Sequence, residues 1–227
     1  MVLVSNPKKF VFLKTRKTAG TSIEMMLEEY CAPPGHVVTE STKELETEYG
    51  LVGARMNKSG PTPKWRNHIG ATPVAKHIGR DTFDEYLKLS SVRNPFSRTI
   101  SQFYWQFVWQ KREVPETFEE NKSQFNDYIF SEMFKQDYHV VHAFNKFILD
   151  DAFRLEHLDE DFDRIGKRLG IPLSKAAMPK TKDNSGFKPD FNYIYFFTQK
   201  VVDEIRKKQR WVFDHFDYSE DPRDARL

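Results

Sequence analysis

A short apolar run that ends in a polar turn is the feature that most constrains the fold. Phe10–Leu13 has the length and continuous apolar character of a buried parallel strand, and the polar residues 14–20 follow it directly. Apolar side chains then recur at the spacing of one helical face, at Ile23, Met26, Leu27 and Tyr30, and residues 21–24 resemble a capping box. The pattern predicts a strand, a loop and a helix in that order.

A second strand, polar turn and helix are predicted near the middle of the chain. Leu87–Val92 is typical of a core strand, preceded by a short capped helix over residues 81–87, and it ends at Arg93 before a long aromatic helix over residues 97–111. Further patterns predict a helix from Thr117 with a capping box, and helical residues 140–149. A strand over 153–155 and a helix over 159–169 that stops at Gly170 follow. The chain then continues in a basic loop over 171–190 and a last helix over 198–213.

This alternation predicts an α/β fold with a central, mostly parallel sheet flanked by helices. Ligands of such sheets bind at the carboxyl ends of the strands, which directs attention to the two polar turns. The 227 residues fit a single domain over residues 1–227. Within it, the irregular residues 32–73 are expected to form loops and short elements over the acceptor site, as a lid.

Composition and charge narrow the class of protein. The 35 basic and 33 acidic residues leave a net charge of +2, which is too balanced for a nucleic-acid binder, so we expect no nucleic-acid partner. Cys31 is the only cysteine, which excludes an intrachain disulfide and fits a reducing, cytoplasmic compartment. No stretch approaches the ~18 consecutive apolar residues of a membrane span, so we expect neither secretion nor a membrane partner.

The first turn has the composition of an anion site. Lys14, Arg16 and Lys17 precede Gly20 and two hydroxyl residues where a helix begins, and helix N-termini favour phosphate or sulfate. An ATP-binding P-loop requires the lysine directly after the second glycine, whereas Lys17 precedes Gly20 by three positions. The order of residues therefore argues against a magnesium nucleotide site.

At these residues the sequence resembles a known family. Residues 17–22, Lys-Thr-Ala-Gly-Thr-Ser, are similar to the 5′-phosphosulfate loop of sulfotransferases that use PAPS (3′-phosphoadenosine 5′-phosphosulfate), and residues 92–101 are similar to their 3′-phosphate segment. Residues 153–162 and 212–218 resemble segments of the carbohydrate-type branch. The resemblance covers most of the chain, with residues 32–67 as the main gap, and implies a P-loop-like sulfotransferase architecture with PAPS as donor and 3′,5′-ADP as product.

Carried over by position, the resemblance implies a set of nucleotide-binding residues. The 5′-phosphosulfate loop comprises Arg16, Lys17, Thr18, Ala19, Gly20, Thr21 and Ser22, and the 3′-phosphate contacts are Arg93 and Ser101. Arg93 and Ser101 are eight residues apart, so a guanidinium that leaves the strand and a hydroxyl one or two turns into the helix can converge on one phosphate. Arg98 is either a third contact or a surface ion-pair partner, and Lys182 or Lys188 of the basic loop is a further phosphate candidate.

Sulfuryl transfer by analogy with phosphoryl transfer is in-line, with negative charge accumulating on the leaving oxygen. Lys17 is the candidate to neutralise that charge, and the mechanism requires no metal. The acceptor needs a base that is effective near neutrality, a role that suits histidine. His77 is the first choice because a similar histidine precedes the second strand in carbohydrate-type sulfotransferases; His68 and Glu40 are the alternatives.

The acceptor class stays open at this stage. A hydroxyl or an amine of a carbohydrate or a small metabolite is compatible with the sequence. Two other functions compete with sulfonate transfer: a nucleotide kinase, which would require Mg²⁺ and ATP, and a non-catalytic module that binds sulfated or phosphorylated ligands. His139 and His142 lie three apart, but no third metal ligand is suggested by spacing, so packing is the better interpretation of this pair.

Overall fold

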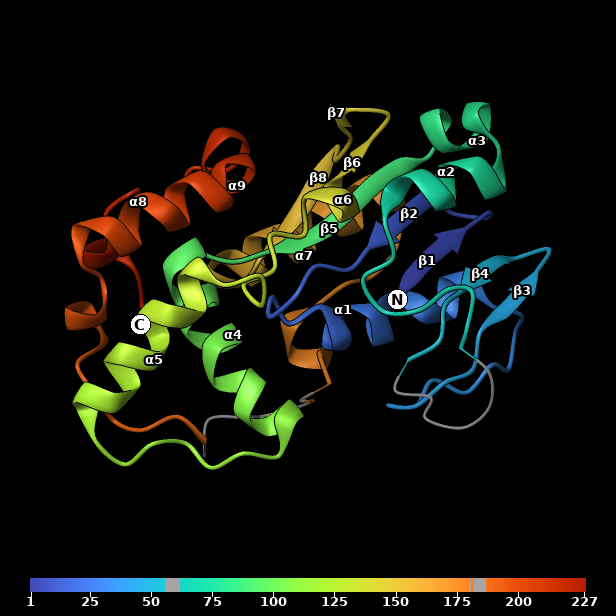
Figure 1. Cartoon of the computed structure of the whole chain (residues 1–227). Coiled ribbons are helices and arrows are strands. Elements are labelled where there is room, and N and C mark those ends of the chain that lie inside the picture. The colour runs from blue at the N-terminus through green and yellow to red at the C-terminus, as the bar shows by residue number, and fades with distance from the viewer. Residues whose placement is uncertain (56–61, 180, 182–186) are drawn as a thin grey trace. The chain divides into compact units, whose positions relative to one another are not determined.

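The computed structural model describes residues 1–55, 62–179, 181 and 187–227. The chain, drawn in Figure 1, divides into two units by its internal contacts. The first comprises Met1–Val92 and Asp137–Thr181, and the second comprises Arg93–Gln136 and Lys182–Leu227. The single domain predicted over residues 1–227 stays a prediction.

The first unit contains a six-stranded sheet in the order β3-β4-β1-β2-β5-β8. β2 (Phe10–Leu13) pairs in parallel with β5 (Leu87–Val92), and β5 pairs in parallel with β8 (Asp151–Arg154). β1 (Val2–Ser5), β4 (Gly50–Val52) and β3 (Leu45–Thr47) extend the sheet beyond β2 through antiparallel pairs. The predicted α/β fold is confirmed. Its parallel part is β2, β5 and β8, and both predicted turns follow strands of this part.

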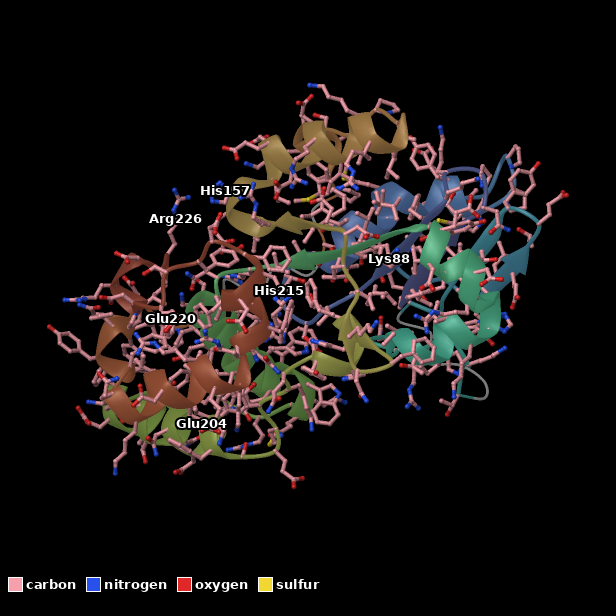
Figure 2. The ribbon with its side chains drawn as sticks, turned by 90° about the horizontal axis from the view of Figure 1, so that it is seen from above. Lys88, His157, Glu204, His215, Glu220 and Arg226 are labelled. Atoms are coloured by element: carbon pink, nitrogen blue, oxygen red, sulfur yellow. The ribbon has the colours of Figure 1, made fainter. Side chains whose placement is uncertain are left out.

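Helices cover both faces of the sheet. α1 (Gly20–Glu28) and α7 (Leu158–Leu169) place Ile23, Leu27, Phe162 and Ile165 in one core cluster with Phe10, Phe12, Leu89 and Phe153 of the strands. α2 (Ala71–Ile78) lies on the opposite side, as the view from above shows, with α3 (Arg80–Glu85) next to it in the chain (Figure 2). α7 ends at Gly170 in the left-handed conformation, as predicted.

The second unit is helical and aromatic. α4 (Pro95–Gln110) begins at Asn94, whose side chain accepts hydrogen bonds from two amides of the first turn. α5 (Phe118–Phe130) begins at Thr117 with the predicted capping box. α8 (Gln199–Lys208) packs on both of these helices and is followed by α9 (Arg210–His215). The predicted aromatic helix packs into the core of this unit, because Phe103, Tyr104 and Phe107 lie in a buried cluster with Phe125 and Phe196.

Two predictions of helix extent are wrong. Residues 140–149 do not continue as a helix: α6 (Tyr138–Val141) ends, and β6 (His142–Ala143) and β7 (Lys146–Phe147) form a hairpin. The two residues between these strands, Phe144 and Asn145, have positive φ angles of 51° and 62°, as a tight hairpin turn requires. The predicted last helix is two helices, α8 and α9, separated at the buried Gln209.

The connecting segments contain short 3₁₀ helices. Their bounds are Glu29–Cys31, Leu155–His157, Lys175–Ala177, Tyr193–Phe196 and Pro222–Asp224. Figure 2 shows His157 next to the start of α7 and His215 at the end of α9. In the described part of the chain, no helix combines the length and the apolar character that crossing a membrane requires.

Candidate active site

The backbone of the loop between β2 and α1 alternates in handedness. Lys17 and Ala19 have positive φ angles of 60° and 58°, whereas Thr18 between them and Gly20 after them do not. Positive φ is uncommon for residues with a side chain, and its cost is retained mainly at functional sites. Successive amides of alternating handedness form a concave, anion-binding surface, as in phosphate-binding loops. The turn therefore has the backbone geometry of an anion site.

The N-terminus of α1 directly follows this loop and has no side-chain cap. Ala19 is the N-cap residue and makes no capping hydrogen bond. The capping box predicted over residues 21–24 is therefore wrong, because the side chains of Thr21 and Glu24 both bond to Lys14 instead. An α-helix leaves its first amides without intrahelical partners and carries positive potential at that end, which suits an anionic ligand.

Lys14 lies beneath the loop rather than on its surface. Its side chain is 6% exposed, and Nζ lies 2.8 Å from Thr21 Oγ1 and 2.7 Å from Glu24 Oε2. Glu24 is fully buried. Glu24 Oε1 also lies 3.6 Å from the terminal ammonium of Met1, so the carboxylate offsets only part of the positive charge beneath the loop.

A cluster of hydroxyl groups attaches the loop to β5. Thr18 Oγ1 lies 2.7 Å from Ser91 Oγ and 3.0 Å from Thr15 Oγ1. Gly20 packs into the same place: a Cβ atom there would lie 2.9 Å from Lys14 Cγ and 3.2 Å from Ser91 Oγ. The glycine is thus required for close packing of α1 on the sheet, which sets the position of the whole loop.

Arg16 is held by a residue that the sequence did not single out. Its guanidinium forms an ion pair with Asp137, and its backbone amide donates to Asp137 Oδ2 at 2.8 Å. The Asp137 side chain is fully buried, and its backbone has a positive φ of 57°. The two residues are 121 positions apart, so no local pattern could have related them.

His68 lies against the same loop. Its Nδ1 is 3.0 Å from the carbonyl oxygen of Lys14. Because a carbonyl only accepts, Nδ1 carries the proton of the neutral ring and Nε2 is the basic nitrogen. Burial lowers the pKa of His68 well below its ordinary value; the negative charge of Asp137 opposes the shift, and the positive charge of Arg16 adds to it. The ring is therefore neutral at neutral pH, with Nε2 unprotonated.

His77 has different surroundings. It is exposed on α2, with Nε2 2.6 Å from Glu46 Oε1 and Nδ1 3.2 Å from the ammonium nitrogen of Lys64. Its ring lies 4.7 Å from that of Trp65, along an open hollow also lined by Ile69, Thr72, Pro73 and Lys76. Both ring nitrogens of His77 are thus occupied. Glu40 is exposed, and its carbonyl oxygen accepts from Arg55 Nε at 3.3 Å.

The second predicted turn belongs to the second unit. Arg93 directly follows β5 and Ser101 lies on α4, both half-buried. Burial and the positive charge of Arg93 lower the pKa of Lys188, whose Nζ lies 4.4 Å from the centre of the Tyr193 ring. Arg98, in contrast, is 1% exposed and donates to Gln209 Oε1 and the Lys135 carbonyl, which places it in the packing of α4. Lys182 lies outside the described residues.

Comparison with known families decides the class of this protein. The model of the sulfotransferase family matches residues 1–185, a range that includes both predicted turns. The chain belongs to the sulfotransferase family. It is thus a transferase of the sulfonate group, as its resemblance to this family predicted, and membership favours that activity over a nucleotide kinase. No curated protein and no solved structure matches the chain.

The loop between β2 and α1 and the first turn of α1 carry the residues of this sulfotransferase that suit an anion. Lys17 comes from the loop, and Thr21 and Ser22 come from the first turn of α1. The hydroxyl of Ser22 lies 3.0 Å from that of Thr181. Among the described residues, no group of three or more His, Cys, Asp and Glu side chains is arranged to hold a metal ion. His139 and His142 both have other partners. His139 Nε2 donates to the His68 carbonyl at 3.1 Å, and the ring of His142 stacks on that of Tyr138.

Proposed function

We propose that this sulfotransferase takes PAPS as its donor and transfers the sulfonate group to a hydroxyl or amine of a carbohydrate or small-metabolite acceptor. The released product is 3′,5′-ADP. The observation that carries the proposal is the alternating backbone at Lys17 and Ala19, which precedes an α1 terminus without a side-chain cap. This geometry suits an anionic group, and membership of the sulfotransferase family supports the choice of a phosphosulfate.

The residues of the loop fit the 5′-phosphosulfate by their chemistry. Amides around Ala19 and Gly20 and the hydroxyls of Thr21 and Ser22 supply donors, and Lys17 supplies the positive charge. Arg16 belongs to the same loop, with Asp137 fixing its guanidinium. When bound, PAPS supplies an activated sulfuryl group, and these residues bind and orient it.

The proposed 3′-phosphate contacts are Arg93 and Ser101, with Lys188 as a third. Burial, and after it the positive charge of Arg93, lowers the pKa of Lys188, so the two cations repel each other. A phosphate near both would relieve that repulsion and form charge-assisted hydrogen bonds. This like-charge pair is the reason for including Lys188.

Lys17 and His68 are the proposed catalytic residues. Lys17 neutralises the charge that develops on the leaving oxygen, a contribution on the order of 3 kcal/mol for one preorganised donor. His68 removes the proton from the acceptor through Nε2, since Nδ1 donates to the Lys14 carbonyl. His77, the first choice from sequence, is less suited because Glu46 and Lys64 occupy both of its ring nitrogens. Glu40 remains an alternative base, which the contacts described above do not support.

Measuring the affinity for three nucleotides tests the proposal that PAPS is the donor. Isothermal titration without Mg²⁺ compares 3′,5′-ADP, 5′-AMP and ATP on the wild type, Arg93→Ala and the control Arg80→Ala, whose side chain forms an exposed pair with Asp84. We expect 3′,5′-ADP to bind most tightly and Arg93→Ala to weaken it by about 10- to 100-fold, the value of charged hydrogen bonds, with 5′-AMP unaffected. Equal affinity for the three nucleotides, or no binding, would refute the proposal.

Transfer itself tests the acceptor. Incubation with PAPS labelled in the sulfuryl group, together with panels of sugars, phenols and amines, should give labelled product with at least one hydroxyl or amine acceptor. Tight binding of 3′,5′-ADP without transfer to any acceptor in the panels would instead support the non-catalytic module.

A further inference from the structure

We infer that Lys14 is a positioning residue, which holds the Thr21 side chain in place for the 5′-phosphosulfate. The inference rests on the proposed function, because it takes Thr21 to contact the donor. It goes beyond that function by assigning a role to a buried lysine that makes no proposed contact with PAPS. Three observations support it: the hydrogen bond to Thr21, the carboxylate of Glu24, and the packing of Gly20.

The hydrogen bond fixes the direction of the Thr21 hydroxyl. An ammonium group only donates, so Thr21 Oγ1, 2.8 Å from Lys14 Nζ, must be the acceptor. The hydroxyl proton of Thr21 then points away from Lys14. A donor that is already oriented loses little side-chain entropy when an anion binds, which is the advantage of preorganisation.

The carboxylate of Glu24 offsets part of the charge of Lys14. Glu24 Oε2 lies 2.7 Å from Lys14 Nζ, and both side chains are almost fully excluded from solvent. Glu24 Oε1 also lies 3.6 Å from the terminal ammonium of Met1, so two cations share this carboxylate. The direct contact through which Lys14 can act on the donor site is its hydrogen bond to Thr21.

Burial of this ion pair also needs a reason other than stability. Replacing a buried ion pair by apolar side chains is often neutral or stabilising, so stability alone does not account for Lys14 and Glu24. The stem of Lys14 fills the space under Gly20, where a Cβ atom would lie 2.9 Å from Lys14 Cγ. One side chain thus supports the first turn of α1 with its stem and holds Thr21 with its ammonium group.

A double-mutant cycle tests the inference. The variants are Lys14→Met/Glu24→Gln, which removes both charges together, Thr21→Val, and the combination of all three substitutions. Dissociation constants for PAPS are measured by titration. We expect Lys14→Met/Glu24→Gln to raise the dissociation constant about tenfold when Thr21 is present, and less than about twofold in the Thr21→Val background, because the two changes remove the same interaction.

Two other outcomes would overturn the inference. An equal increase in both backgrounds would mean that Lys14 acts independently of Thr21, and no increase would mean that it does not act on binding. If the wild type binds neither PAPS nor 3′,5′-ADP, the proposed function fails as well, so the two failures are distinguishable.

Controls separate positioning from folding. Lys9→Met removes an exposed lysine paired with Glu85 and should leave the dissociation constant unchanged. Thermal unfolding of each variant confirms that it is folded at the temperature of the titration. If Lys14→Met/Glu24→Gln does not fold, Lys14→Met/Glu24→Met replaces it in the same cycle, since it also removes both charges and the hydrogen bond to Thr21 and introduces no polar group.

Discussion

Replacing His68 by asparagine changes two measurable properties of the protein for separate physical reasons. His68 has a positive φ of 56°, and asparagine tolerates this conformation better than most residues. The asparagine amide can also donate to the Lys14 carbonyl, as Nδ1 of His68 does at 3.0 Å. The substitution therefore removes the basic nitrogen and the titration while it keeps the backbone and the hydrogen bond.

The first property is activity. General-base catalysis contributes about 10²- to 10⁴-fold, so His68→Asn should lower kcat by two to four decades, with a much smaller effect on the affinity for 3′,5′-ADP. In the wild type, kcat/KM should stay constant as the pH falls through about 6.5, the ordinary histidine pKa, and decline only at lower pH. The reason is that burial lowers the pKa of His68.

The second property is the dependence of stability on pH. Because the pKa of His68 is lower in the folded chain, the unfolded chain binds its proton first as the pH falls. The free energy of unfolding then decreases by up to about 1.4 kcal/mol per pH unit, from about pH 6.5 down to the pKa in the folded state. His68→Asn should remove this contribution and be relatively more stable than the wild type at low pH.

Urea unfolding at pH 7.5, 6.5 and 5.5 measures the second property, and initial rates of sulfonate transfer measure the first. His77→Asn is the matched control; its ring pairs with Glu46 at the surface, so we expect kcat to stay within about threefold. Loss of activity in His77→Asn with full activity in His68→Asn would refute the assignment of the base. Equal pH slopes for wild type and His68→Asn would refute the buried, neutral histidine.

Three further substitutions test the loop. Lys17→Ala should lower kcat by about two to three decades with the melting temperature unchanged, and a matching loss of thermal stability would contradict a catalytic role. Gly20→Ala should destabilise the fold by about 1–3 kcal/mol in urea unfolding, because the added Cβ would lie 2.9 Å from the Lys14 stem; an unchanged midpoint would contradict this packing. Asp137→Asn should cost about 3 kcal/mol in the same assay, because it leaves Arg16 without its carboxylate; a loss under about 1 kcal/mol would show the pair to be weak.

Much of the fold could be predicted from local patterns. The strands Phe10–Leu13 and Leu87–Val92 were predicted with the bounds that the structure has. The first is an apolar run bounded by polar residues, and the second lies between a short helix and the polar turn that begins at Arg93. The capping box at Thr117 was also predictable, because its two partners, Thr117 and Glu120, are only three residues apart. β1 was missed because four apolar residues at the start of the chain give no period to detect, and the hairpin after α6 because its turn residues are not glycines.

The sequence by itself determined the strand, loop and helix that carry Lys17 and Gly20, and with them the resemblance to the sulfotransferase family. Order and spacing along the chain are sufficient for such a motif, because its residues are neighbours. Only the tertiary structure decided the surroundings of His68 and His77, whose ring partners come from elsewhere in the chain. The burial of Lys14 depends likewise on how α1 packs against the sheet, since desolvation and pairing are properties of the folded chain.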